Sequence, residues 1–483
     1  MKTNGVARVA LAAGLLSTGA FAADAASACS SVLTPAYSPL PAIAKGWQAQ
    51  LVAGGLKKPR SIQFDSAGAL LIVDSGKGVL RYTFTDNGAT CLTLDKQELL
   101  VNQTNLNHGL GLSTDGKTLY ASSVESVFAW DYDAQAGKVS GEPRVVINNM
   151  SNNDLVTRTL LVSQKQPGYI VVSRGGTSDL DEATVLSSGL SQIRAFNLAN
   201  LTSISKPYDF ETSGRVLGWG LRNSVGVAEH PVTGGIYSVE NSIDGVTRQG
   251  TDIHENNPGE ELNFHGYLNA TTDHQGGNYG YPRCFAVWDP NEIPDNAGLA
   301  VGTQFAMTEN TTVTDELCAS DYVSPRLTFP AHQAPLDIKF NPEGSEAYVS
   351  FHGSFDKTNP VGYSLSVVAF DPATGEPTAD ASSTTALSDV MTNPDHKVCP
   401  DKCFRPVGLA WDTKGRLWMS SDSTGEIFVL QKSNAQPSGT ATASGTIVTA
   451  TGSPSGSGAG SLWQGAGLCY AAALVAGGLL MAM

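Results

Sequence analysis

The stretch PRSIQFDSAGALLIVDSG, residues 59–76, begins with an alternating apolar segment, turns at a polar stretch containing Gly68, and ends with a second, more apolar segment. Alternation with a period of two around such a turn is typical of two antiparallel strands joined as a hairpin. The same form returns along the chain. The later copies are residues 107–123, 157–175, 222–241, 334–353 and 405–430.

Six copies of one small unit predict a radial repeat. A single strand pair cannot bury both of its faces, so the copies must pack on one another. Almost no helical periodicity appears between Leu51 and Leu430. We therefore expect an all-β protein, a six-bladed β-propeller. The widest interval, residues 240–333, is rich in Gly and Asn, and its Tyr, Trp and Cys residues favour an ordered functional loop region.

Both ends of the chain differ from this repeat. Residues 1–23 combine basic Lys2 and Arg8 with an apolar run and small residues, the order of a signal peptide. We expect the propeller to span residues 24–432, followed by a Ser/Thr/Gly-rich stalk over 433–457. Residues 458–483 end in an apolar tail and match a glycosylphosphatidylinositol (GPI) attachment signal, so we expect a secreted, cell-surface protein.

Cysteine usage agrees with export to an oxidising compartment. Of the seven cysteines, Cys469 lies in the segment that anchor attachment would remove, which leaves an even set of six. Disulfides are therefore expected, although the sequence does not fix their pairing. The pairs Cys399 with Cys403 and Cys284 with Cys318 are the choices that close short loops.

Glycosylation and charge also bear on the class of protein. The net charge of −15 argues against nucleic-acid binding, which needs a basic face, and a soluble monomer is expected. N-glycosylation is predicted at five Asn-X-Ser/Thr sequons. They are Asn102, Asn149, Asn200, Asn269 and Asn310.

Basic residues recur where the first strand of each copy begins. In a propeller these strands line the central channel, so their entrances meet at one end of the axis. Clustered guanidinium groups repel one another unless anions lie among them, which predicts a channel that binds a small polyanion. The residues are Arg60, His108, Arg158, Arg222 with Asn223, and Arg405. The fifth copy has Ala334 there, with His332 just upstream.

Several motifs then resemble one family. They are GLRNSVGVAEHPVTGGIYSVEN (220–241), NNPGEELNFHG (256–266), GGNYGYP (276–282), HQAPLDIKF (332–340), FHGSF (351–355) and CFRPVGLAWD (403–412). In this order they resemble the pyrroloquinoline-quinone-dependent glucose and sorbosone dehydrogenases, in particular the secreted fungal pyranose dehydrogenase branch. The resemblance covers residues 59–430 and implies a six-bladed propeller that oxidises an aldose at its anomeric carbon, passing hydride to the quinone and electrons to an external acceptor.

The resemblance also implies roles for individual residues. Arg222 and Asn223 would contact the quinone, while Arg405 and Lys357 would hold its carboxylates. Arg60 and Arg158 are assigned to the cofactor from the ring of basic residues and a looser match. A calcium ion is expected in the segment VENSIDG (239–245), with the main-chain carbonyls of Ser242 and Ile243 as ligands.

One position departs from the family pattern. Members carry a histidine base three residues before the arginine of the third copy, where this chain has Leu155. A leucine cannot accept a proton, so another group must serve as base. His108 is the first candidate, followed by His352 and His332, with Asp154 next to Leu155. Because of Leu155, a catalytically inactive binding propeller remains an alternative. A calcium-dependent lactonase-type hydrolase is a weaker one, since the channel entrances are basic.

Overall fold

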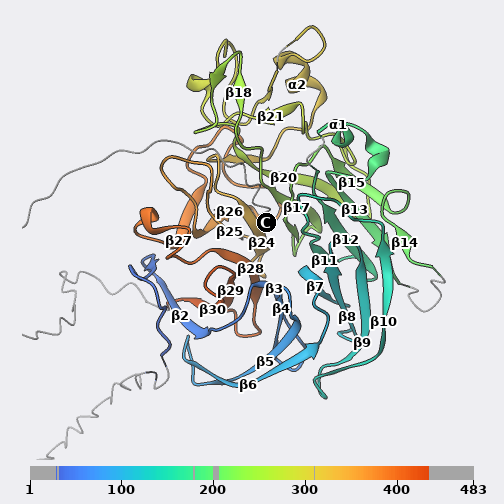
Figure 1. Cartoon of the computed structure of the whole chain (residues 1–483), viewed down its shortest axis with the longest axis vertical. Coiled ribbons are helices and arrows are strands. Elements are labelled where there is room, and N and C mark those ends of the chain that lie inside the picture. Colours follow the sequence, from blue (N-terminus) through green and yellow to red (C-terminus); the bar gives the residue numbers. More distant parts are fainter. Residues whose placement is uncertain (1–28, 30–31, 178–179, 200–205, 309, 434–483) are drawn as a thin grey trace, which may run out of the picture.

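The computed structural model describes residues 29, 32–177, 180–199, 206–308 and 310–433. Six antiparallel sheets stand in a ring around a central axis, as Figure 1 shows, and the expected six-bladed propeller is confirmed. Each of the six repeated stretches supplies the two innermost strands of one sheet. Period-two alternation therefore identified the strand pairs correctly.

The first three blades follow one another in sequence. Blade 1 consists of β3 (Pro59–Phe64), β4 (Leu70–Asp74), β5 (Gly78–Asp86) and β6 (Leu92–Val101). Blade 2 consists of β7 (Leu106–Leu112), β8 (Thr118–Ser123), β9 (Val127–Asp133) and β10 (Lys138–Asn148), with the short β14 (Tyr208–Asp209) added in parallel. Blade 3 consists of β11 (Leu160–Val162), β12 (Tyr169–Arg174), β13 (Gln192–Asn197) and β15 (Arg215–Trp219).

The other three blades complete the ring. Blade 4 consists of β16 (Gly226–Glu229), β17 (Gly235–Glu240), β20 (Glu260–Tyr267) and β23 (Leu327–Phe329). Blade 5 consists of β24 (Pro335–Phe340), β25 (Glu346–Phe351), β26 (Ser364–Ala369) and β27 (Leu387–Thr392), with β1 (Ala42–Ile43) at its edge. Blade 6 consists of β28 (Pro406–Trp411), β29 (Leu417–Ser421), β30 (Glu426–Lys432) and β2 (Trp47–Ala53).

Blade 6 closes the ring because its outermost strand comes from the other end of the chain. Strand β2 pairs antiparallel with β30, from Trp47 opposite Lys432 to Ala53 opposite Ile427. The repeat pattern did not predict this pairing, since β2 is not part of any repeated unit. It joins the first and last parts of the propeller through main-chain hydrogen bonds.

The six inner strands contact one another in a closed cycle, β3, β7, β11, β16, β24 and β28. Glycine allows this close approach. A Cβ atom on Gly408 of β28 would lie 2.4 Å from the carbonyl oxygen of Arg60, and one on Gly109 of β7 would lie 2.3 Å from that of Arg158. Any larger residue at these positions would push neighbouring blades apart.

The hydrophobic core is divided into layers between adjacent blades. One cluster joins blades 6 and 1 around Trp418, whose ring centroid lies 5.1 Å from that of Phe64 and 5.0 Å from that of Phe84. Burying a large apolar side chain contributes roughly 1.5–3 kcal/mol. Since each layer needs both neighbours, the blades stabilise one another rather than folding as separate units.

The long interval before blade 5 is an ordered insertion, as expected. It carries the pairs β18 (Thr247–Arg248) with β19 (Thr251–Asp252) and β21 (Cys284–Ala286) with β22 (Gln304–Ala306), and helix α2 (Asp315–Asp321). In Figure 1 it projects from one side of the ring. Buried Arg248 fixes it by pairing with the Asp315 carboxylate at 2.8 Å.

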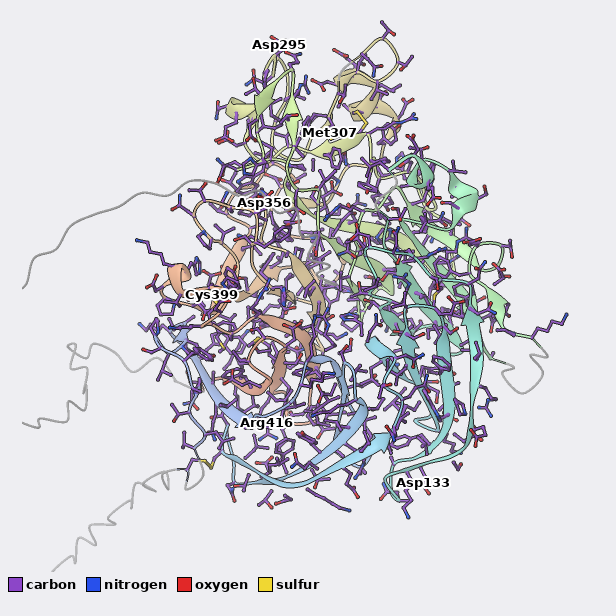
Figure 2. All side chains as sticks on the ribbon, viewed as in Figure 1. Asp133, Asp295, Met307, Asp356, Cys399 and Arg416 are labelled. Carbon is purple, nitrogen blue, oxygen red and sulfur yellow. A yellow bond between two sulfur atoms is a disulfide. The ribbon has the colours of Figure 1, made fainter. Side chains whose placement is uncertain are left out.

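Disulfides form three pairs. Cys284–Cys318 and Cys399–Cys403 are the two short-loop pairs that the sequence favoured, and Cys29–Cys91 is the third. Cys284–Cys318 ties β21 to α2 inside the insertion. Cys29–Cys91 ties the segment before β2 to the turn between β5 and β6. Figure 2 labels Cys399, on the outer side of blade 5.

The terminal predictions lie outside the described residues, namely the signal peptide, the stalk and the GPI-attachment segment, as does the sequon at Asn200. The other four sequon asparagines are exposed, so glycosylation there stays a prediction. Within the described part of the chain, no helix is long and apolar enough to span a bilayer.

Candidate active site

A buried ionic cluster joins blades 1, 2, 5 and 6 at one end of the axis. Asp422, which directly follows β29, accepts from the Arg60 guanidinium at 2.5 Å and from Nε2 of His352 at 2.8 Å. The Arg60 Nε also donates to Nδ1 of His108 at 3.2 Å. The entrances that carry Arg60 and His108 therefore do converge, as the sequence predicted, and His352, named only as a candidate base, joins them through Asp422.

These contacts determine which nitrogen of each histidine carries a proton. Nε2 of His352 must donate because the Asp422 carboxylate can only accept, which leaves Nδ1 of His352 as a lone pair. That Nδ1 is buried and has no partner among the described residues. His108 has the same tautomer, since its Nδ1 accepts from Arg60. Its remaining Nε2 is a donor and cannot serve as a base.

Burial keeps both histidines neutral. It lowers the pKa of His352 to about 4, with Asp422 opposing and Arg405 reinforcing the shift. Burial also lowers the pKa of His108 well below its usual range, and Arg60 adds to this. Burial would raise the pKa of Asp422, but His352, Arg60 and Lys58 together hold it far below its usual range. Asp422 is therefore a permanent anion between two neutral rings.

The cluster carries more positive than negative charge. Arg405 donates to the main-chain oxygens of His352 at 3.0 Å and Gly353 at 3.1 Å, and its guanidinium lies over the Tyr363 ring. Burial lowers the pKa of Lys58, and the nearby Arg60 lowers it further. Nη2 of Arg60 is buried without a partner among the described residues. An anion with several carboxylates would satisfy these groups.

A second cluster surrounds Arg222 on blade 4. Its guanidinium donates to the carbonyl oxygen of Ser242 at 2.5 Å and to the Asp244 carboxylate at 3.1 Å. Buried Asn223 contacts the side chain of Asn241 at 3.4 Å. The sequence placed Arg222 and Asn223 together at this entrance, and the structure agrees. Arg222 remains partly exposed, so it faces the open end of the axis.

Buried carboxyls stand behind Arg222. Burial raises the pKa of Glu260 and of Glu261 to about 7. It also raises the pKa of Glu240 well above its usual range, and the nearby Glu261 carboxyl raises that pKa further. Glu260 accepts from the main-chain N–H groups of Ser242 at 2.7 Å and Ala334 at 2.9 Å. Glu260 thereby fixes the segment that was expected to bind calcium.

His332 belongs to this second cluster. Its Nδ1 lies 3.2 Å from the Asp244 carboxylate and its Nε2 lies 2.5 Å from the carbonyl oxygen of His254. Both partners only accept, so both ring nitrogens carry protons. Burial alone would lower the pKa of His332, but Asp244 outweighs it and the pKa is raised. A doubly protonated ring cannot take a proton from a substrate.

The expected metal ligands are close together but partly engaged. The Ser242 carbonyl accepts from Arg222, while the Asp244 carboxylate bridges Arg222 and His332. Ile243 lies between them in sequence. Within the described ranges, no group of three or more His, Cys, Asp or Glu side chains has the arrangement of a metal site. A metal here would depend mainly on main-chain oxygens, as the sequence expectation also required.

Arg158 lies away from any ligand. It is 0 % exposed, and its three guanidinium nitrogens donate to main-chain carbonyls of residues 124, 150, 155 and 157 and to the Asn152 side chain. Arginine has five N–H donors, and all of them are used here. This arrangement does not match the direct cofactor contact expected from the sequence. The β11 entrance needs Arg158 to hold its own irregular backbone.

Two further candidates, Lys357 and Asp154, lie outside the Asp422 cluster. Lys357 donates to the carbonyl oxygen of Glu255 and to Asn256, so it ties the segment after β25 to the insertion. Asp356 in Figure 2 marks that segment. Asp154 is exposed, and Leu155 is 8 % exposed beside Gly175 and Asn223. No side-chain hydrogen bond brings Asp154 into either cluster.

Asp422 is the main residue that the sequence argument missed. It directly follows the second strand of its blade, as His352 follows β25, whereas only first-strand entrances were aligned. Aligning the ends of the second strands would have drawn attention to His352 and Asp422, because each is the first residue after its strand. Lys58 was missed because it lies just before the aligned window.

Fold and site together define a class, a six-bladed propeller with a cationic, buried anion pocket and an acid–histidine pair at one end of its axis. The comparisons with known proteins agree with this class. A family model described as TrAA12-like matches residues 41–433, and the chain belongs to that family.

Relatives with curated functions cover the same region. The chain is 52 % identical over 398 residues to a pyrroloquinoline quinone-dependent sugar dehydrogenase of Hypocrea jecorina, covering 82 % of this chain and 90 % of that protein. It is 37 % identical over 405 residues to a pyrroloquinoline quinone-dependent pyranose dehydrogenase of Coprinopsis cinerea, covering 81 % of this chain. The matched region spans 54 % of that longer relative.

Solved structures give the same result. A calcium structure of a Trichoderma reesei family AA12 enzyme superposes with a TM-score of 0.81 at 52 % identity, covering 84 % of this chain and all of that one. The holo form of the quinone domain of Coprinopsis cinerea pyranose dehydrogenase gives a TM-score of 0.77 at 34 % identity, covering 83 % of this chain and 99 % of that one.

Proposed function

We propose that this protein is a pyrroloquinoline-quinone-dependent sugar dehydrogenase that oxidises an aldose at its anomeric carbon. The observation that carries the proposal is the buried, unpartnered Nδ1 of His352 beside the cationic pocket of Arg60 and Arg405. The names of the relatives in Hypocrea and Coprinopsis support the same reading.

The chain's residues fit the quinone, which is a tricarboxylate. Nη2 of Arg60 is an unused buried donor, Arg405 and Lys58 add positive charge, and Arg222 with Asn223 are the expected contacts from blade 4. Arginine suits planar carboxylates because its N–H groups form a fork. We assign cofactor binding to these residues. Arg158 and Lys357 support the site by stabilising the backbone around it.

His352 is the proposed general base in place of the missing histidine at Leu155. The Asp422 carboxylate holds the tautomer in which Nδ1 accepts the proton of the sugar hydroxyl and Nε2 stays protonated. It also stabilises the imidazolium that results. The bound quinone supplies the acceptor for the substrate hydride. The other histidines at this end, His108 and His332, lack a free lone pair and act by orientation and charge.

Calcium is proposed as a second cofactor, bound through the carbonyls of Ser242 and Ile243 with the nearby Asp244 carboxylate. Oxygen donors of this kind suit calcium, and a calcium structure of a relative supports the choice. Arg222 would have to release the Ser242 carbonyl when the ion binds. Extracellular location, electron transfer to a separate acceptor, a GPI anchor and a monomeric state complete the proposal.

The test is reconstitution. Purified cofactor-free protein is titrated with pyrroloquinoline quinone in calcium-containing buffer, and dye reduction is then scanned over a panel of aldoses. We expect saturable quinone binding and aldose-dependent turnover in the wild type, and binding without turnover in His352→Ala. A matched control is His274→Ala, because His274 is exposed in the segment between β20 and β21.

The outcomes separate the candidate functions. Absence of quinone binding would refute the proposal. Quinone binding without turnover on any aldose would favour the inactive binding propeller, the second candidate, which Leu155 supports. Full turnover in His352→Ala would refute the base assignment but leave the cofactor assignment intact.

A further inference from the structure

A separate cavity of about 440 Å³ lies between blades 4 and 5 and the insertion. Its walls come from β23, from β27, from Trp288 of the insertion and from residues 361–364 at the start of β26. The loop before β27 closes one side, where a Cβ on Gly302 would lie 3.0 Å from the Ala381 carbonyl oxygen. Four segments far apart in sequence therefore build one cavity.

The inner end of this cavity holds unused polar atoms. The Thr328 hydroxyl and the Gln333 side-chain oxygen are both buried and have no hydrogen-bond partner among the described residues. Thr328 itself is 1 % exposed. Leaving such an atom unsatisfied costs about 1–3 kcal/mol, so a native site of this kind points to a bound molecule.

The lining indicates a neutral ligand. No Lys or Arg lines the cavity, and Asp389 is the sole carboxylate among the lining residues. Asp389 already accepts from Ser366 at 2.7 Å through one oxygen. This composition differs sharply from the cationic pocket around Arg60. An anionic cofactor or nucleotide would find no Lys or Arg here.

Apolar and hydroxyl-bearing groups alternate around the wall. Trp288, Phe329 and Leu387 offer apolar surface, while the hydroxyl groups of Thr328, Ser383 and Thr384 lie among them. A pyranose has apolar C–H faces and hydroxyl groups around its edge, so it matches both kinds of surface. The volume also falls within the roughly 300–1,000 Å³ typical of small-molecule sites.

Burial decreases along the cavity. Thr328 is buried, Trp288 and Ser383 are half-buried, and Thr384 and Asp389 are exposed. One end is therefore closed and the other opens to solvent, which suits the end of a longer chain of sugars rather than a wholly enclosed molecule.

We propose that this cavity binds a neutral oligosaccharide at a site separate from the axial one. The two sites are neighbours, because the Gln333 carbonyl oxygen accepts from the N–H of Gly353, whose own carbonyl accepts from Arg405. The proposal does not rest on the quinone or on catalysis. A saccharide chain bound in this cavity would be held beside the axial site.

The test uses full-length protein without quinone, so its result is independent of the dehydrogenase proposal. Cellobiose, maltose, xylobiose and mannobiose are tested by saturation-transfer NMR and calorimetry. We expect binding of at least one disaccharide, weakened roughly tenfold or more in Trp288→Ala and in Thr328→Val. Thr328→Val keeps the side-chain shape and removes only the hydroxyl, so it remains informative if Trp288→Ala is unstable.

Trp47→Ala is the matched control, because Trp47 is also a half-buried tryptophan on an outer segment but lies against Tyr348, away from the cavity. It should leave disaccharide binding unchanged. The proposal is overturned if no disaccharide binds. It is equally overturned if binding survives both cavity variants and is lost instead in Arg222→Ala, which would place the sugar at the axial site.

Discussion

The guanidinium groups of Arg158 and Arg222 differ in what they leave for a ligand. Arg158 donates to main-chain carbonyls at its own blade entrance and to those of Val124 and Met150, which follow strands of blade 2, and burial lowers its pKa to about 9. Arg222 is partly exposed and bonds to the segment that is the candidate calcium site. Arginines at equivalent repeat positions therefore have different roles. Arg158 stabilises the backbone in its blade, whereas Arg222 contacts the candidate calcium segment.

We predict opposite effects for the two alanine substitutions. Arg158→Ala should destabilise the protein by about 3 kcal/mol or more, because several buried carbonyl oxygens lose their donor. Arg222→Ala should change stability much less and weaken quinone binding at least tenfold. Urea unfolding and quinone titration of both variants measure this. Similar losses of stability in both variants would contradict it.

Substituting Asp422 tests the proposed base, His352, without removing it. Asp422→Asn keeps the size of the side chain, but its amide can donate to His352 and favour the wrong tautomer. We expect kcat to fall roughly 10²–10⁴-fold, the usual contribution of a general base, with quinone still bound. Steady-state kinetics measure the loss. Asp412→Asn is the control, since Asp412 pairs with Arg416 on the far side of blade 6 and should affect stability alone.

At the scale of elements, β17 and β20 carry the raised carboxyls. Because burial raises the pKa of Glu261 to about 7, the folded state binds its proton more tightly than the unfolded chain does. Its contribution to stability is therefore present below the unfolded pKa and is lost as pH rises through about 7. We predict that Glu261→Gln matches the wild type at pH 5 and is more stable at pH 8. Urea unfolding in calcium-free buffer measures this, and an unchanged difference between the two pH values would refute it.

Ring closure is the second feature at this scale. The Cys29–Cys91 disulfide closes a loop of 62 residues around β2, whereas Cys399–Cys403 closes one of 4. In the chain-entropy model the longer loop contributes about 4 kcal/mol and the shorter about 2 kcal/mol. The Cys29→Ser/Cys91→Ser variant should therefore lose more stability in urea unfolding than Cys399→Ser/Cys403→Ser. The reverse order would show that β2 closes the ring without help from this bridge.

For the whole molecule, the repeat made the blade number predictable, because six hairpins leave faces that can be buried only in a ring. The closing partner of β30 was not predictable from the repeat, since β2 has no second strand of its own. The contact between Arg60 and His108 was predictable because strand entrances converge, and the cofactor roles of Arg60, Arg222 and Asn223 stay predictions. That the donors of buried Arg158 bind main-chain carbonyls was not predictable, because periodicity does not show where a backbone becomes irregular. Asp422 was missed because its position follows a second strand.

The quinone should stabilise the ring as a whole. Its proposed contacts come from blades 6 and 1, whose inner strands touch, and from blade 4, whose inner strand contacts those of blades 3 and 5. A ligand that binds the folded state alone at 100 times its Kd adds about 2.7 kcal/mol. We predict a rise in Tm that grows with quinone concentration at constant calcium and is reduced in Arg222→Ala at each concentration. Differential scanning fluorimetry measures it. A Tm independent of quinone, in protein shown by titration to bind it, would contradict this prediction, because the unfolded chain would then have to bind quinone as tightly as the folded ring does.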